Sequence, residues 1–142
     1  MTQGNELLEM IETVDHTDSD ALDEIDVRVF CHVMGYKLGM MESSFLAEPD
    51  ILVAQYADGS LVAGCRAIKY TRSQDPLIAI RPPLWNFAIR NEPFVYPSTK
   101  FDCKASSRTK HLYTPDLPTE YLAHLYAIIK AKIWDQNNKE KK

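Results

Sequence analysis

The chain has 142 residues, of which 45% are hydrophobic and 25% charged, a composition that excludes a disordered or collagenous protein. Its length suffices for one domain with a buried core. The net charge of −4 conceals an asymmetry, because residues 1–60 sum to −11, residues 61–113 to +6 and residues 114–142 to +1. The N-terminus has no secretion signal and no apolar window approaches the ~20 residues of a membrane helix, so we expect a cytoplasmic protein that does not associate with membranes.

Two helices are predicted in the acidic first part of the chain. Residues 5–14 place their apolar side chains on one helical face. A longer amphipathic helix is predicted to begin at Ser19 or Asp20, either of which can cap it, and to end at Met34. Gly35 then stands where a C-terminal cap belongs.

The residues that follow contain the first strand signals. Residues 36–49 have weak periodicity and are expected to be irregular. Residues 51–56 and 61–70 are rich in β-forming residues and are separated by a segment that contains Asp58-Gly59. Asp-Gly between two such runs predicts an antiparallel hairpin.

Further strands are expected in the middle of the chain. Residues 77–80 are a candidate, which Pro82-Pro83 ends because proline cannot continue ladder pairing. Residues 84–90 alternate, so that Trp85 and Phe87 share one face of a strand.

Two short strand candidates, residues 94–96 and 101–105, come next. Residues 106–110 are polar and basic and are expected to form a loop.

The end of the chain predicts one more helix and a tail. Asp116 or Thr119 can cap a helix whose apolar side chains repeat at helical spacing, and residues 135–142 are expected to be a frayed polar tail. The element order favours an α+β sandwich, in which an antiparallel β-sheet is packed by N-terminal helices and one C-terminal helix. We expect a single domain over residues 1–134.

Two segments resemble a known family. Residues 25–36, Ile-Asp-Val-Arg-Val-Phe-Cys-His-Val-Met-Gly-Tyr, are similar to the Leu-Asp-x-x-Val-x-x-x-Val-Met-Gly-Trp opening of the phage ABA sandwich domain, found in small phage and prophage proteins. Residues 117–120, Leu-Pro-Thr-Glu, resemble the entry into that family's C-terminal helix. Tyr36 replaces the usual Trp, and the middle of this chain is longer. The resemblance implies a phage origin and an α+β fold, and it transfers no reaction and no catalytic residue.

The sequence carries no strong signal for catalysis or for a metal. Three cysteines, an odd number without Cys-x-x-Cys spacing, are expected to be reduced and buried. Four histidines lack the spacing of a zinc motif. We therefore expect no metal site, no cofactor and no catalytic residue. The rival hypothesis is a small hydrolase or nuclease that uses His111 or Cys103.

The basic middle segment is the strongest functional signal. Residues 61–113 hold nine Lys or Arg residues against three acids, with aromatic residues between them. Cations attract phosphate, and aromatic rings or Arg planes stack on bases, so the segment predicts a binding surface. The expected binding residues are Arg66, Lys69, Arg81, Trp85, Arg90, Lys104, Arg108 and Lys110.

Two other interpretations stay open. The aromatic face of residues 84–90 can be a core face, and the basic residues can be solvated partners of the acidic helices, because exposed ion pairs are common and weak. Alternatively, the acidic residues 1–60 can present a nucleic-acid-like surface to a basic cleft of a host enzyme.

We therefore hypothesise a non-enzymatic phage or prophage accessory protein that acts by stoichiometric binding in the host cytoplasm and inhibits a bacterial antiviral defence system. The expected partner is a host defence protein or a nucleotide signal, and nucleic-acid binding is the alternative. Exposed sheet edges and the charge asymmetry favour a homodimer or a higher homo-oligomer.

Overall fold

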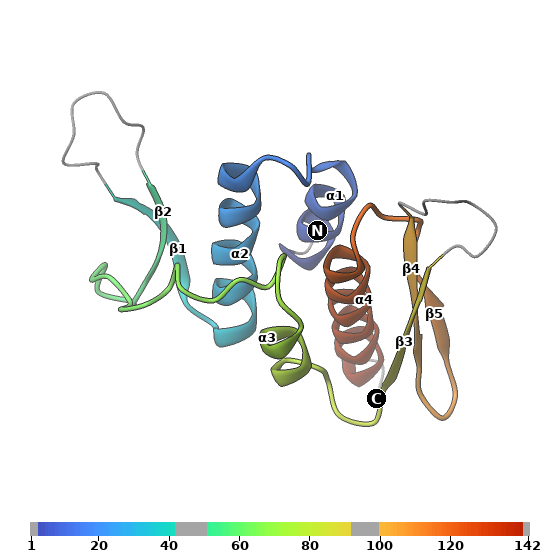
Figure 1. Ribbon diagram of the computed structural model, residues 1–142. Helices are drawn as coiled ribbons and strands as arrows, with labels where there is room; N and C mark the ends of the chain where they lie inside the picture. Colours follow the sequence, from blue (N-terminus) through green and yellow to red (C-terminus); the bar gives the residue numbers. More distant parts are fainter. Residues whose placement is uncertain (1–2, 42–50, 92–99, 141–142) are drawn as a thin grey trace.

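The computed structural model describes residues 3–41, 51–91 and 100–140. Within these ranges, helices separate two small antiparallel sheets, so the predicted α+β class with helices packed on antiparallel strands is confirmed (Figure 1). The elements in chain order are α1 (Gln3–Thr13), α2 (Ser19–Met34), β1 (Lys37–Met41), β2 (Ile51–Gln55), α3 (Gln74–Ala79), β3 (Asn86–Asn91), β4 (Phe101–Ser106), β5 (His111–Tyr113) and α4 (Glu120–Glu140).

The two sheets lie on opposite sides of the helices (Figure 1). The smaller sheet pairs β1 with β2 and packs against α2. The three-stranded sheet has the order β3-β4-β5 and packs against α4. Cys103 and Ala105 of β4 are buried on the face toward α4, whereas Arg90 and Tyr113 on the other face are exposed. The three-stranded sheet therefore has one covered face and one open face.

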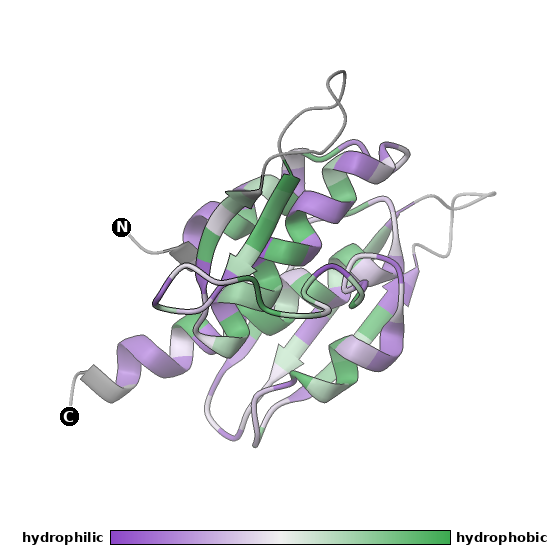
Figure 2. Ribbon diagram, turned by 90° about the vertical axis from the view of Figure 1, so that its left-hand side faces the viewer, coloured by the Kyte–Doolittle hydropathy of each residue, from purple (hydrophilic) through white to green (hydrophobic). Residues whose placement is uncertain are grey.

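Helix α4 is the centre of the core. Residues 122–129 are all buried, because α1 and α3 pack on the helix from one side and the three-stranded sheet packs on it from the other. Of the two expected caps, Thr119 acts as one, since its Oγ1 accepts a hydrogen bond of 3.1 Å from the Leu122 amide. The last turns of α4 are hydrophilic and extend away from the other elements (Figure 2).

The C-terminal boundary differs from the expectation. Helix α4 continues to Glu140, so the residues expected to fray from Asp135 onward are helical up to that point. The Asp135 carboxylate accepts hydrogen bonds of 3.0 and 3.1 Å from Trp85 Nε1, which attaches this part of the helix to the start of the three-stranded sheet.

The N-cap of helix α2 differs from the two expected residues, Ser19 and Asp20, and lies one residue before them. Its N-cap is Asp18, whose carboxylate accepts hydrogen bonds from the amides of Asp20 and Ala21. The predicted C-terminal cap is confirmed, because Gly35 has a left-handed backbone with φ of 78° and its amide donates to the Cys31 carbonyl.

The strand predicted at residues 77–80 is wrong, since these residues belong to helix α3 and its C-terminal cap. A run of four apolar residues does not distinguish a buried helix from a strand. Pro76 is compatible with the first turn of α3, and Leu77 is fully buried.

The hairpin prediction is right about the turn and wrong about the pairing. The turn forms, with Tyr56 donating to the Ser60 carbonyl, but the second arm pairs only through the bridge between Gln55 and Leu61. The remainder of residues 61–72 forms successive turns, so the predicted second strand is absent there. The main partner of β2 is β1, which lies in the segment that was expected to be irregular.

The other predictions for the second half of the chain are confirmed where the structure describes it. Residues 84–90 contain most of β3 and residues 101–105 lie in β4. Of the loop predicted at residues 106–110, residues 107–110 form the turn between β4 and β5, whereas Ser106 still belongs to β4. The candidate strand at residues 94–96 lies outside the described residues. None of the helices in the described ranges has the length and apolar content needed to span a bilayer.

Candidate functional site

Two of the expected binding residues, Arg66 and Lys69, surround an acidic residue of helix α2. The Lys69 ammonium lies 3.0 Å from the Asp23 carboxylate and the Arg66 guanidinium lies 3.8 Å from it. Arg72 also pairs with Asp23. Partial burial acts to raise the pKa of Asp23, but the hydrogen bonds from Arg72 and Lys69 outweigh it and hold that pKa below its ordinary value. These cations therefore connect the turn segment to α2.

Asp26, one helical turn after Asp23, continues this connection inside the core. Its side chain is buried and accepts hydrogen bonds of 2.8 Å from the Thr71 amide, 2.9 Å from Thr71 Oγ1 and 2.7 Å from Arg72 Nη2. Burial raises the pKa of Asp26, and these hydrogen bonds act against the rise. The acidic helix and the start of the basic segment thus stabilise each other.

Arg90 and Lys104 lie on the open face of the three-stranded sheet. Arg90 is directly opposite Asp102 and donates two hydrogen bonds to its carboxylate, at 2.9 Å from Nε and 2.8 Å from Nη2. Lys104 Nζ lies 5.8 Å from the centroid of the Tyr113 ring. Arg90 is therefore paired, while Lys104 rests on an exposed aromatic ring.

Arg81 belongs to a polar network next to the core. Its Nε donates a hydrogen bond of 2.9 Å to His124 Nε2, and its guanidinium lies 5.1 Å from the Phe87 ring centroid. His124 is fully buried, and burial lowers its pKa to about 4. Because guanidinium cannot accept a hydrogen bond, Nε2 carries no proton and Nδ1 donates to Gln74 Oε1 at 2.6 Å. Through this hydrogen bond, Arg81 links the segment that follows α3 to helix α4.

Of the remaining three expected residues, Trp85 and Arg108 line one cleft of about 460 Å³, here called the tryptophan cleft. The third, Lys110, does not line it but contacts the ring of Trp134, which does. The turn between β4 and β5 forms one wall of the cleft, the end of α4 forms another, and the segment before β3 forms the third. Its lining residues are Pro83, Leu84, Trp85, Ser107, Arg108, Thr109, Trp134, Asp135 and Asn138.

The aromatic and basic side chains in and next to the tryptophan cleft differ in their exposure and in whether they have bonding partners. Trp85 is 8% exposed and is held through Nε1 by Asp135. Lys110 Nζ lies 4.8 Å from the ring centroid of Trp134. Arg108 is exposed, and within the described part of the chain no carboxylate lies within ion-pair distance of it. Arg108 is therefore available to an incoming ligand.

Leu84, at the rim of the tryptophan cleft, combines two unfavourable features. It has φ of 71°, the only positive φ of a non-glycine residue in the described ranges, and its side chain is 90% exposed. A branched side chain in the left-handed region is strained, and such residues concentrate at sites of recognition. Leu84 thus presents an apolar side chain to solvent at the edge of the cleft.

Sequence reasoning missed Leu84, Trp134 and Asp135 as parts of a site. Leu84 fitted the alternation of a strand, although its position after two prolines is a signal for a break in regular structure. Trp134 lies just beyond the apolar repeat of the last helix, and Asp135 was assigned to the tail. A tryptophan just after the apolar repeat of the predicted helix was the available clue.

The two residues of the hydrolase hypothesis do not face each other. His111 lies opposite Ser106 in the β4–β5 pairing, and Cys103 is three residues from Ser106 along β4, so the side chains of His111 and Cys103 lie on opposite faces of the sheet. Burial raises the pKa of the Cys103 thiol to about 11. The expectation that the cysteines are buried is confirmed for Cys31, Cys65 and Cys103, none of which forms a disulfide.

No family model matches the chain, and neither the curated proteins nor the solved structures contain a significant match to it.

Proposed function

We propose that this protein is a non-enzymatic accessory protein of phage or prophage origin, which acts by stoichiometric binding in the host cytoplasm and inhibits a component of a bacterial antiviral defence system. The phage origin is supported by the likeness of residues 25–36 to the phage ABA sandwich domain. The binding activity is supported by the tryptophan cleft, and this is the observation that carries the proposal.

The composition of the tryptophan cleft suits a recognition surface. Trp134 supplies a partly exposed aromatic ring, Trp85 lines the cleft with a ring that is only 8% exposed, and Arg108 supplies a cation with no ion-pair partner in the described residues. Tryptophan and arginine are enriched among the residues that contribute most to protein–protein affinity. Leu84, fully projected into solvent, adds an apolar contact that only a partner can bury.

The target that fits this cleft best is a protein surface. The Asp135 carboxylate lies in the lining, where it repels a polyanion, and the exposed Leu84 offers nothing to a phosphate. A partner segment with an apolar side chain for Leu84 and the Trp rings, and an acidic group for Arg108, satisfies all of these residues.

The test is a pull-down from the bacterial host followed by titration with the purified target. We expect Leu84→Asp and Arg108→Glu each to weaken binding at least about tenfold, since hot-spot residues contribute ~2 kcal/mol or more. Lys104→Glu, on the open face of the three-stranded sheet, is the matched control and should bind normally. Equal binding by all three variants and the wild-type protein contradicts the proposal.

Stoichiometry separates this function from catalysis and from self-association. Inhibition of the target should titrate to completion at a fixed molar ratio, whereas an enzyme acts far below that ratio. Light scattering of the free protein comes first, because a homodimer that occupies the tryptophan cleft is the competing arrangement. If the free protein is a dimer and Leu84→Asp makes it a monomer, the tryptophan cleft is the site of self-association.

The second candidate is a binder of a nucleotide or nucleic acid. It is favoured by the proximity of the Lys110 ammonium to the Trp134 ring, since a cation next to an aromatic face can hold a phosphate and a base together. Absorbance near 260 nm that copurifies with the protein and that salt removes would support it. If the affinity for the protein target does not change with salt concentration, that result counts against nucleotide or nucleic-acid binding.

A further inference from the structure

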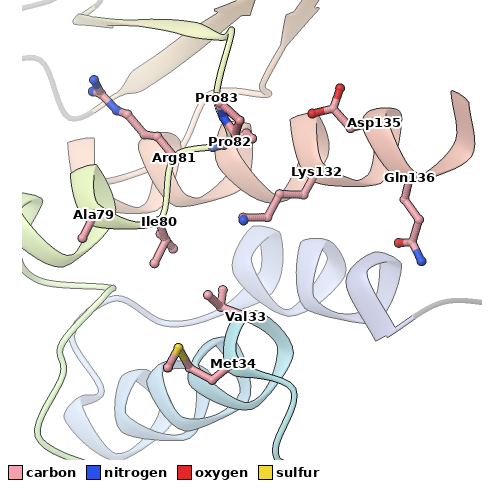
Figure 3. A pocket seen from close by; sticks show the side chains of 10 residues that line it. All are labelled: Val33, Met34, Ala79, Ile80, Arg81, Pro82, Pro83, Lys132, Asp135 and Gln136. Carbon is pink, nitrogen blue, oxygen red and sulfur yellow. The ribbon is translucent and has the colours of Figure 1, made fainter. Parts of the chain in front are cut away.

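A second cleft, of about 510 Å³, lies where the end of α2, the connection after α3 and the helix α4 meet (Figure 3). We call it the lysine cleft. Its walls are largely apolar and include Val33, Met34, Ile80 and the Pro82-Pro83 pair. The lysine cleft and the tryptophan cleft share Pro83 and Asp135 as lining residues.

One cation reaches into this apolar space. Lys132 extends from α4 so that its ammonium group points toward the space that Ile80 and Val33 border (Figure 3). The side chain is half-buried, and within residues 4–40, 51–91 and 100–138 it has no hydrogen bond and no ion pair. Burial lowers the pKa of Lys132, and the charge of the Asp135 carboxylate only partly opposes this. The ammonium group is therefore partly desolvated, and within the described residues it has no ion-paired counter-charge.

The neighbouring charged groups do not supply that counter-charge. The Arg81 guanidinium and the Asp135 carboxylate both point away from the Lys132 ammonium group (Figure 3). Arg81 is bound to His124, and Asp135 is bound to Trp85. His32 also lies near, and burial together with the Lys132 charge lowers its pKa. A neutral imidazole cannot balance an ammonium group, so the lysine cleft keeps an excess positive charge.

We propose that the lysine cleft binds a monocarboxylate that carries an apolar chain. The carboxylate pairs with Lys132 Nζ, and the chain lies against Val33, Met34 and Ile80. Met34 is 54% exposed, and its flexible side chain adapts to an apolar ligand. A cleft of this volume with one polar anchor and apolar walls is typical of small-molecule sites.

The charge count in the cleft selects a carboxylate over a phosphate ester. A phosphate carries a second negative charge and is usually held by several donors at once, whereas Lys132 is the single cation that faces the cleft among the described residues. The carboxylate can belong to a fatty acid or to the C-terminal residue of a peptide with an apolar side chain. The chemistry recognised is the same in both cases.

Calorimetric titration with decanoate tests the proposal, with decanol as the uncharged probe. We expect decanoate to bind the wild-type protein and to bind Lys132→Gln about tenfold more weakly or worse, because a charge-assisted hydrogen bond is lost. Lys130→Gln is the matched control, since Lys130 lies on the same helix but donates to the Tyr113 carbonyl. Decanol should bind the wild-type protein and Lys132→Gln equally weakly. Equal decanoate affinity for the wild-type protein and Lys132→Gln overturns the proposal.

A measurement on the wild-type protein keeps the test valid if Lys132→Gln fails to fold. With ¹³C-labelled lysine, the Lys132 Cε resonance reports the protonation of the ammonium group. Saturation with decanoate should raise the pKa of Lys132, because a neighbouring carboxylate favours the charged form. An unchanged pKa at saturation shows that no carboxylate reaches this group, and the proposal then fails.

Two peptide probes distinguish the sources of the carboxylate. A short peptide that ends in leucine with a free carboxylate is compared with the same peptide as its C-terminal amide and with decanoate. Preference for the free-carboxylate peptide assigns the cleft to a protein C-terminus, and preference for decanoate assigns it to a fatty acid. Failure of decanoate and of the free-carboxylate peptide to bind rejects the site.

Discussion

The carboxylate of Asp26 accepts hydrogen bonds from both the amide and the hydroxyl of Thr71, a residue 45 positions later in the chain. Together with the ion pair to Arg72, these bonds attach the irregular segment after β2 to the buried face of α2. This segment forms few backbone hydrogen bonds of the kind that strands make, so the bonds to Asp26 hold it in place instead.

Substitution of this carboxylate should therefore destabilise the protein strongly. We expect Asp26→Asn to lower the free energy of unfolding by about 3 kcal/mol, because the Arg72 charge loses its buried partner. Glu24→Gln removes an exposed partner of Arg28 on the same helix and should cost less than about 1 kcal/mol. Urea denaturation measures both changes. Equal effects of the two substitutions would show that the buried network adds nothing to stability.

The buried histidine of α4 should make stability depend on pH. Burial lowers the pKa of folded His124 to about 4 from an ordinary value of 6.5, so the folded state binds its proton less readily than the unfolded state. The contribution of His124 is then fully present above pH 6.5 and is lost as the pH falls from 6.5 toward 4, by up to about 3 kcal/mol.

Comparison with His124→Gln isolates this contribution from those of the other titrating groups. Glutamine can still accept from Arg81, so this variant should fold. Its free energy of unfolding, measured from pH 8 to pH 4.5, should fall less steeply than that of the wild-type protein. Identical slopes would show that His124 does not titrate between the folded and unfolded states.

The three cysteines should be unreactive in the native protein. Cys31, Cys65 and Cys103 are buried and free, and burial raises the pKa values of Cys31 and Cys103. We expect a thiol-specific chromogenic disulfide reagent to label none of them at pH 7.5 within minutes and all three in guanidinium chloride. The Cys103→Ala and His111→Ala variants should keep full binding activity. Rapid native labelling of Cys103, or loss of activity in either variant, would revive the hydrolase hypothesis.

Relief of the strain at Leu84 should raise stability while it weakens binding. Leu84→Gly removes the left-handed strain of an exposed leucine, for which we expect a gain of about 0.5–1 kcal/mol after the entropy of glycine in the unfolded state is included. Leu84→Asn is the matched control, because asparagine also tolerates the left-handed backbone region but does not add the conformational entropy that glycine gives the unfolded state. Thermal unfolding and target titration are the measurements. A less stable Leu84→Gly protein would contradict the account of strain.

Much of the local structure was predictable from the sequence because its causes are local. Gly35 ends α2 because glycine readily adopts a left-handed backbone, and Thr119 caps α4 because its hydroxyl reaches the amide three residues later. The alternation of side chains around Phe87 likewise indicates which face of β3 is covered. The errors occurred where a short apolar run fits two structures, as at Leu77, or where a strand depends on a distant partner, as in β1.

The candidate site was predictable only in part. Trp85, Arg108 and Lys110 were identified as binding residues because aromatic and basic side chains alternate in their segment. The structure places Trp85 and Arg108 in the lining of one cleft and Lys110 against Trp134, which also lines it. The same criterion selected Arg66, Lys69 and Arg90, which the structure places against Asp23 and Asp102. A list of charges does not show which of them find partners.

By itself, the sequence determined the fold class, the glycine cap at Gly35 and the excess of cations between residues 61 and 113, since composition and short-range patterns are properties of the chain alone. Only the tertiary structure decided which cations remain available, because ion pairs join residues far apart in sequence, as with Asp23 and Lys69 at a separation of 46. Lys132 shows the converse. An ordinary lysine on a helix face becomes a candidate anchor only because two distant segments partly bury its ammonium group while the nearby Asp135 carboxylate is bound to Trp85.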